Sequence, residues 1–389
     1  MLLNVRDFAT VQEALDAAAD GDCVYFPSVG VDYRAPSTGW VIQRSLVVCG
    51  DGPGATAGAG SVLLAADENS PVIRVASGVK RVTVADLQLK WDGSVATGTG
   101  DGLICEAGVT AVDIERVAVV GCGGNGFNFV GGNAGSQRID RVGLVDCSIV
   151  GCRGAGVRAS YTDNLYMTGV VARDNWQNGV TITGGSGYLY ECEMDGNCLT
   201  PSWTPSANPY EGQMRFTAMA MVRAEACRIR NIERGSVKRG CVVTGSAGMI
   251  GSCCFEATNA ASASSCEGIV VAGAGTGPVF ISGNRHSNMG TMVRVDAGST
   301  NPPLVRQCTV LPQYDDTGNG SMSLTGVPDG LSGVPHAMRA GSSVLAGIPI
   351  PAYVQDPISG ARNGMMAYNR TLKKLRIYVN GAWRTVELE

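Results

Sequence analysis

Three acidic residues in the middle of the chain have the types and spacing that sugar-cleaving chemistry needs. Asp174 and Asp195 stand 21 residues apart in similar surroundings, and Glu193 lies close to the second of them. Glycosidases that retain configuration hold two carboxylates about 5–5.5 Å apart, and inverting ones about 6.5–9.5 Å apart. Stacked strands lie about 4.8 Å apart, so residues one repeat apart can form such a pair. We therefore predict Asp174, Asp195 and Glu193 as candidate catalytic residues, although an Asp beside Asn or Gly is first of all a turn residue.

A second group of residues has the chemistry to bind sugars rather than cleave them. Aromatic rings offer flat apolar faces for stacking, and neighbouring polar groups fix the orientation of a ligand. The group lies in a proline-rich insertion and in the coils before it, and it consists of Trp176, Tyr188, Tyr190, Trp203, Tyr210, Glu211 and Arg215. Packing in the core, or against another subunit, would explain any single aromatic residue equally well. As a group, these residues predict a glycan-binding surface.

Other kinds of site find little support. His286 and His336 are the only histidines and no nucleophile signature surrounds them, so a catalytic triad is not expected. The fourteen cysteines lack paired zinc-binding spacings, and we expect small buried side chains, with no metal and no cofactor. The net charge of −4 comes without a basic patch, which argues against a nucleic-acid partner. No stretch of about 20 apolar residues predicts membrane insertion.

Short strands joined by glycine-rich turns must position these residues. The chain has 54 glycines and only 16% charged residues. Between residues 62 and 310, apolar runs of three to six residues alternate with Gly, Asn and Asp, and the segment 120–127 is matched by 150–157. A period of about 21 to 30 residues without helices predicts coils that bury their inner faces against one another. The sequence thus indicates an all-β protein, a right-handed single-stranded parallel β-helix.

The segments differ enough in style to predict an organisation along the chain. Residues 1–60 form an N-terminal cap with the first strands, in which Thr10 and Glu13 make a capping box for a helix closed by Gly21. Residues 61–310 form the coils, with the insertion at 197–215. Residues 311–351 are a linker or an irregular region. Residues 352–389 form a small β module with a hairpin turn at Asn380-Gly381, and we expect this module to mediate trimerisation.

Two stretches resemble known families. The run from Phe8 to Ala18, the segment Asp22 to Pro27 and the Gly50-Asp51-Gly52 turn resemble the first coil of pectate-lyase-like β-helix proteins. The acidic stretch that often precedes the helix in that family is missing here, which weakens any inference about enzymatic activity. The run from Gly364 to Arg384 is similar to short terminal modules of phage tail fibres.

Together the two resemblances imply a tailspike or tail-fibre protein of a phage virion. Such a protein would be made in the host cytoplasm, form a homotrimer and bind a host cell-surface polysaccharide. A tail adaptor or another virion protein would attach it. Two alternatives stay open: a polysaccharide lyase or glycoside hydrolase of the β-helix type, and a structural virion decoration protein without a ligand.

Overall fold

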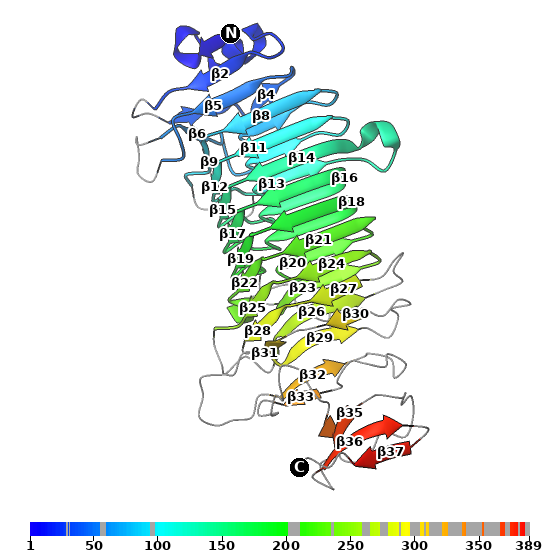
Figure 1. The fold of residues 1–389 in the computed structure, drawn as a ribbon. Helices are drawn as coiled ribbons and strands as arrows, with labels where there is room; N and C mark the ends of the chain where they lie inside the picture. The colour runs from blue at the N-terminus through cyan, green and yellow to red at the C-terminus, as the bar shows by residue number, and fades with distance from the viewer. Residues whose placement is uncertain are drawn as a thin grey trace.

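The computed structural model confirms the predicted fold class, a right-handed parallel β-helix with a helical cap and a small C-terminal β module (Figure 1). It describes residues 1–295 except 29, 31, 55–59, 94–97, 201–210, 235–236, 259–264, 273–278 and 288. Beyond that point it describes the strand segments 304–306, 309–310, 321–325, 337–339, 352–353, 366–369, 374–379 and 382–385.

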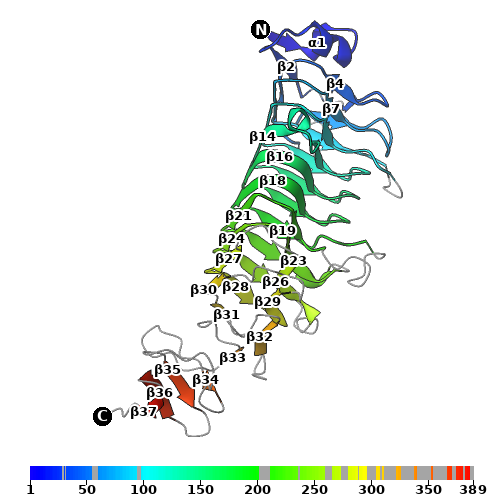
Figure 2. The same ribbon diagram turned by 90° about the vertical axis from the view of Figure 1, so that its right-hand side faces the viewer.

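The helix α1 (Val11–Ala17) lies across the N-terminal end of the coils (Figure 2). The Thr10 side chain accepts a hydrogen bond from the backbone N–H of Glu13 at 3.2 Å, as the capping box predicts. Ala14 and Leu15 are buried against the first coil. The helix ends earlier than predicted, because Ala18 is already extended; Gly21, with φ +88°, serves the turn that leads into the next strand. The short helix η1 (Val5–Asp7) precedes α1.

Each coil contributes one strand to each of three parallel columns, which we number in chain order within a coil. The first column contains β4 (Trp40–Ile42), β7 (Ile73–Val75), β10 (Leu103–Cys105), β13 (Phe127–Val130), β16 (Val157–Thr168), β18 (Val180–Tyr190), β20 (Met214–Thr217), β23 (Arg239–Thr244), β26 (Glu267–Ala272), β29 (Thr291–Val295) and β32 (Ser321–Thr325).

The second column contains β1 (Leu2–Asn4), β2 (Cys23–Phe26), β5 (Val47–Gly50), β8 (Arg81–Ala85), β11 (Ala111–Glu115), β14 (Ile139–Val145), the C-terminal halves of β16 and β18, β21 (Met221–Glu225), β24 (Gly248–Gly251), β27 (Val279–Ser282) and β30 (Leu304–Arg306). The strands β16 and β18 are long enough to serve both columns. Two further short helices, η2 (Gly135–Gln137) and η3 (Ile232–Arg234), lie in the connections.

The third column contains β3 (Tyr33–Arg34), β6 (Val62–Leu64), β9 (Gln88–Lys90), β12 (Ala118–Val120), β15 (Ser148–Val150), β17 (Val171–Arg173), β19 (Glu193–Asp195), β22 (Arg228–Arg230), β25 (Cys254–Glu256), β28 (Arg285–Ser287) and β31 (Thr309–Val310).

Strict alternation along each strand sends one set of side chains inward. In the second column, Val82, Val112, Val142 and Leu165 occupy equivalent positions in successive coils, and all four are fully buried. Burial of an aliphatic side chain of this size contributes about 1.5–3 kcal/mol. The repeated stack therefore stabilises the fold coil by coil, and it leaves the outward positions free for other purposes.

A left-handed residue makes the corner between the second and third columns. In the runs 82–89 and 112–119, which alternate without a break in the sequence, Asp86 and Arg116 have φ of +56° and +52°. The backbone N–H of Arg116 donates to the carbonyl of Val145 in the next coil, so the corners are also stacked. Each run is thus two strands that meet at an angle.

The C-terminal region contains short strands of a different kind. β32 pairs antiparallel with β33 (Ala337–Arg339) inside the predicted linker 311–351, whose other residues lie outside the described part. β34 (Ala352–Tyr353), β35 (Met366–Asn369), β36 (Lys374–Val379) and β37 (Ala382–Thr385) form a four-stranded sheet. Val379 pairs with Ala382, which leaves the two residues of the predicted hairpin turn between them.

Candidate functional site

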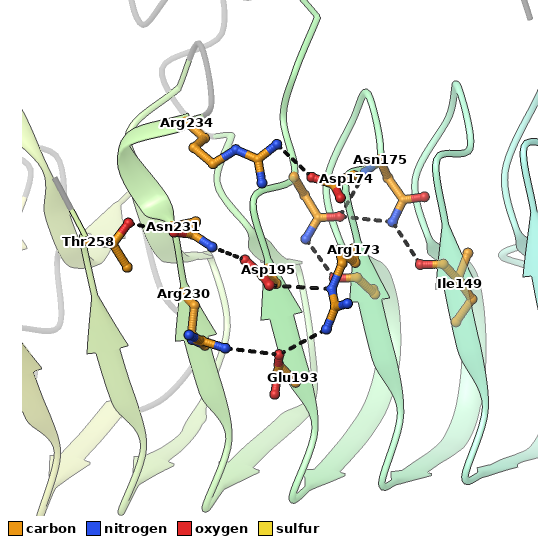
Figure 3. A network of polar contacts seen from close by, with 12 residues as sticks. Ile149, Arg173, Asp174, Asn175, Glu193, Asp195, Arg230, Asn231, Arg234 and Thr258 are labelled. Carbon is orange, nitrogen blue, oxygen red and sulfur yellow. Dashed lines mark hydrogen bonds and ion pairs between the residues drawn. The ribbon is translucent and has the colours of Figure 1, made fainter.

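The three predicted catalytic residues lie on the outer face of the third column (Figure 3). Glu193 and Asp195 belong to β19, while Asp174 follows the end of β17. Arg173, not Asp174, is the register partner of Asp195. Asp174 has φ +53°, the conformation of a turn residue, and its carboxylate therefore does not occupy the position one coil away from Asp195. The spacing of 21 residues in the sequence misses the true register by one residue.

Every one of these carboxylates has a guanidinium partner. Arg173 Nε lies 3.3 Å from Asp195 Oδ2, and the Asn231 side-chain amide donates to Asp195 Oδ1. Glu193 Oε1 lies 3.5 Å from Arg173 Nη2 and 3.7 Å from Arg230 Nη1. These two acids are thus neutralised within the protein, and so is Asp174, which is described next.

Asp174 is held by a residue from two coils further along the chain. Arg234 Nη2, at the end of η3, lies 2.9 Å from Asp174 Oδ1. Between them stands Gly196, where a Cβ atom would come within 2.9 Å of the Arg234 guanidinium and within 3.3 Å of the Asp174 carboxylate. Glycine at this turn therefore leaves room for the ion pair.

The third column carries a repeating pattern of charge. Arg173, Asp195 and Arg230 stand in register in successive coils, and Glu256 continues the row, 3.7 Å from Arg230. We call this row, with Glu193, the charge ladder. Opposite charges on neighbouring strands attract, and each charged side chain in this row has an oppositely charged side chain on a neighbouring strand. The arrangement is that of a self-compensated surface, in which each carboxylate has an arginine partner.

A pocket of about 340 Å³ opens on the outer face of the first column, across β16, β18 and β20. This volume lies within the usual range for small-ligand sites. Its walls combine hydroxyl, amide, guanidinium and carboxylate groups, and the lining residues are Ala155, Arg158, Ser160, Gln177, Asn178, Thr181, Thr183, Glu211 and Arg215. Arg158, Thr181 and Arg215 are register neighbours in three successive coils. Glu211 and Arg215, two members of the predicted glycan-binding group, both line this pocket.

Glu211 is the organising group of this pocket. It is 7% exposed, and its two carboxylate oxygens are used differently. One forms an ion pair with Arg215 Nη1, and the other accepts a hydrogen bond of 2.9 Å from the Asn178 side chain. A buried carboxylate held by a cation and an amide is fixed in place, which makes Glu211 a rigid acceptor at the back of the pocket.

An aromatic platform stands beside the pocket. The Arg153 guanidinium carbon lies 4.5 Å above the centre of the Trp176 ring, and the ring is half-buried. The backbone carbonyl of Trp176 accepts hydrogen bonds from the Thr200 N–H at 3.0 Å and from its hydroxyl at 2.7 Å. The chain leading into the insertion is thus fastened next to Gln177 and Asn178. Trp203 and Tyr210 lie outside the described residues.

Tyr188 and Tyr190 lie on a different surface from the pocket. Both belong to the C-terminal half of β18, in the second column, where Tyr188 stacks on Tyr166 of β16 with ring centres 5.0 Å apart. On β21 the register partners of Tyr188 and Tyr190 are the charged residues Arg223 and Glu225, and apolar side chains on the same face follow with Met221 on β21, Met249 on β24 and Phe280 on β27. We call this set the aromatic stripe, and it consists of Tyr166, Tyr188, Tyr190, Met221, Met249 and Phe280.

Arg158, Asn178 and Thr181 were not predicted, although the sequence held a signal for them. The segments Ala155-Gly156-Val157 and Asn178-Gly179-Val180 match in the repeat, so the next residues, Arg158 and Thr181, must be neighbours. The side chains of Val157 and Val180 point inward, and side chains alternate along a strand. Arg158 and Thr181, the next residues, therefore face outward.

The coil interior also holds groups with altered chemistry. Burial raises the pKa of the Cys105 thiol to about 12 and that of Cys147 to about 11. Burial likewise lowers the pKa of His286 to about 3, and the ring stacks on Phe255 at 5.0 Å. Neither ring nitrogen has a hydrogen-bond partner among the described residues. These groups are inert packing units.

Within the described residues, no three His, Cys, Asp or Glu side chains are grouped so that they could hold a metal ion. Nor does any helix in that part of the chain combine the length and the apolar character that crossing a membrane requires.

No protein-family model and no curated protein matches the chain. Similar solved structures include the ORF18 protein of Geobacillus virus E2, with 15% identity, a TM-score of 0.44 and coverage of 100% of this chain and 86% of that one. The A-module of the mannuronan C-5 epimerase AlgE6 of Azotobacter vinelandii has 17% identity, a TM-score of 0.39 and coverage of 80% and 99%. Tailspike protein 3 of bacteriophage CBA120 has 10% identity, a TM-score of 0.24 and coverage of 99% and 69%. None of these TM-scores reaches 0.5.

Proposed function

We propose that this chain is a phage virion protein of the tailspike or tail-fibre kind that binds a bacterial surface polysaccharide as a homotrimer. The observation that carries the binding role is the polar pocket across β16, β18 and β20. It offers side-chain donors and acceptors from neighbouring coils, beside a half-buried tryptophan. A sugar polymer presents hydroxyl groups and flat ring faces, and this surface suits both. The virion assignment rests on the resemblance of the C-terminal run to tail-fibre modules.

Binding is favoured over cleavage because of the state of the acidic residues. Asp174, Asp195 and Glu193 are each paired with arginine on the third column, away from the pocket. In the pocket itself, Glu211 is the lining carboxylate, and it is already paired with Arg215. An inverting or retaining mechanism needs two carboxyl groups across one bond, and the lining of the pocket offers Glu211 without a second carboxylate.

The aromatic stripe supports the trimeric state. Tyr166, Tyr190 and Phe280 are 46%, 48% and 44% exposed, and they lie on one face of the second column, where the ion pair of Arg223 and Glu225 stands between the tyrosines and Phe280. Apolar side chains arranged along one face, rather than scattered singly, are typical of contacts between proteins. We assign this face to the contact between protomers, with the C-terminal sheet as a second contact. A tail adaptor or another virion protein would hold the trimer on the particle.

The test is a binding measurement on two matched variants. Glu211→Gln removes the charge that holds Arg215 and keeps the shape of the side chain, whereas Glu256→Gln does the same to a carboxylate of the charge ladder. On an array of capsular polysaccharides and lipopolysaccharides, wild type should bind at least one polymer. Glu211→Gln should weaken that binding about 10-fold or more, because a charge-assisted hydrogen bond contributes about 1.5–3 kcal/mol. Glu256→Gln should bind as wild type does. Equal loss in both variants would contradict the proposal.

A further inference from the structure

The pocket on the first column contains a cation that is not held in an ion pair within the described residues. Arg158 is exposed, and within the described residues it forms neither an ion pair nor a hydrogen bond. Its outward neighbour two coils away, Arg215, is by contrast paired with Glu211 and bonded to Thr217 at 3.3 Å. The lining of the pocket therefore carries two guanidinium groups and one carboxylate.

The nearest alternatives for Arg158 inside the protein are already occupied. On one side, Asn128 is its register neighbour, and the Asn128 side chain donates to Asp101 Oδ2 at 2.7 Å. Asp101 Oδ1 in turn accepts from the Asn125 backbone and side chain. Burial raises the pKa of Asp101 and the positive charge of Arg158 acts to lower it, but the two residues do not form an ion pair. On the other side stands Thr181, whose buried hydroxyl has no hydrogen-bond partner among the described residues.

A second arginine without an ion pair lies beside the pocket. Arg153 stacks on Trp176 and has no carboxylate within ion-pair distance among the described residues. Stacking on an aromatic face leaves the in-plane N–H donors of a guanidinium free for a ligand. The contrast with the third column is direct, since Arg173 and Arg230 both have carboxylate partners there.

We infer that the polysaccharide bound in this pocket is acidic, and that Arg158 pairs with a carboxylate group carried by one of its sugar units. This inference rests on the proposed function and names the class of ligand. A guanidinium binds a carboxylate through two parallel N–H donors, which gives orientation as well as attraction. Arg153 supplies further positive charge next to the same groove, and Thr181 offers a hydroxyl in the row between Arg158 and Arg215.

The experiment changes the charge on each side of the contact. Arg158→Gln removes the guanidinium from the protein. Carbodiimide activation followed by borohydride reduction converts the carboxylates of the same polysaccharide into neutral alcohols. Each change alone should lower affinity about 10-fold in biolayer interferometry at low salt, and the two together should cost little more than one. Arg230→Gln, in the charge ladder, is the matched control and should bind as wild type does.

The outcomes separate the inference from the function on which it rests. Binding that is confined to carboxylate-bearing polymers and is lost on reduction supports the inference. Binding to neutral polymers, or binding that survives reduction unchanged, overturns the inference while leaving a glycan-binding protein. Tight binding to phosphate-bearing teichoic acids alone also overturns it, because the charge would then be a phosphate. A wild-type chain that binds no polysaccharide on the array overturns the proposed function itself, and the inference with it.

Discussion

The outer faces of the first and third columns are built by the same coils, yet they treat charge in opposite ways. On the third column, Arg173, Asp195 and Arg230 alternate in register, so that each charge is answered by the next coil. On the first column, Arg158, Thr181 and Arg215 stand in register, and Glu211 answers only one of the two arginines. In a stacked fold, residues one repeat apart in the sequence become neighbours on one face. Where their charges alternate, they pair with one another, and where a charge is left unpaired, it can bind a ligand.

The outer face of the second column differs from both, because it carries exposed aromatic side chains. The largest effect that we expect is the loss of the trimer when these side chains are removed. Replacing Tyr166 and Tyr188 together by serine removes the stacked pair at the N-terminal end of the aromatic stripe. We expect the trimer to dissociate to monomers at nanomolar concentration in mass photometry, because these rings would supply buried apolar area between protomers. Val130→Ser, an exposed apolar residue of the first column, should leave the trimer intact.

Truncation before Ala352 tests the C-terminal sheet in the same instrument. Loss of the trimer in the truncated chain alone would place the association in that sheet and not in the stripe. A full-length wild-type chain that is monomeric would contradict the trimeric part of the account.

The outer faces of the columns surround one interior from which water is excluded. His286 is buried in this interior, so its protonation reports whether water is excluded there. Its folded pKa of about 3 lies below the ordinary value near 6.5, so between these values the unfolded chain binds a proton that the folded chain does not. Stability should therefore fall as pH falls from 6.5 toward 3, by up to about 1.4 kcal/mol per pH unit. Urea denaturation at pH 7 and pH 5 should show this loss in wild type and a smaller loss in His286→Phe, which keeps the stack on Phe255. Equal losses in the two chains would mean that His286 is not dry.

A smaller effect is expected in the charge ladder. The Asp195 side chain is 10% exposed and serves both Arg173 and Asn231, so Asp195→Asn should destabilise the protein by about 1–2 kcal/mol. The Asp174 side chain is 33% exposed and has one arginine partner. Asp174→Asn should therefore lower the free energy of unfolding by about 0.5 kcal/mol or less. Both values come from urea denaturation at neutral pH. If Asp195→Asn kept its stability but abolished breakdown of a host polysaccharide, the ladder would instead be a catalytic site.

Sequence periodicity was sufficient for the fold but not for the register. Alternating runs and glycine-rich turns predict stacked coils, because each strand shows one apolar face whatever the lengths of the turns between strands. The pairing of Asp174 with Asp195 required the register to within one residue. Similar neighbours suggested an interval of 21, whereas the strands align Arg173 with Asp195. Turns that vary in length conceal such a shift in a single sequence.

The candidate site was predictable in part for a related reason. Glu211 and Arg215 lie four residues apart at the end of the insertion, so proximity in the sequence is enough to bring them together. Tyr188 and Tyr190 are also near in sequence, but β18 passes from the first column into the second, and the two rings point from another face. The corner at Gly184 and Gly185, both with positive φ, separates them from the pocket.

The most direct test of the account is a structure of the protein with a bound fragment of its host polysaccharide. The account predicts sugar density across β16, β18 and β20, with a carboxylate against Arg158 and a hydroxyl near Glu211, and an unchanged charge ladder. Density on the third column, with a sugar between Asp174 and Asp195 and an empty pocket on the first, would contradict it.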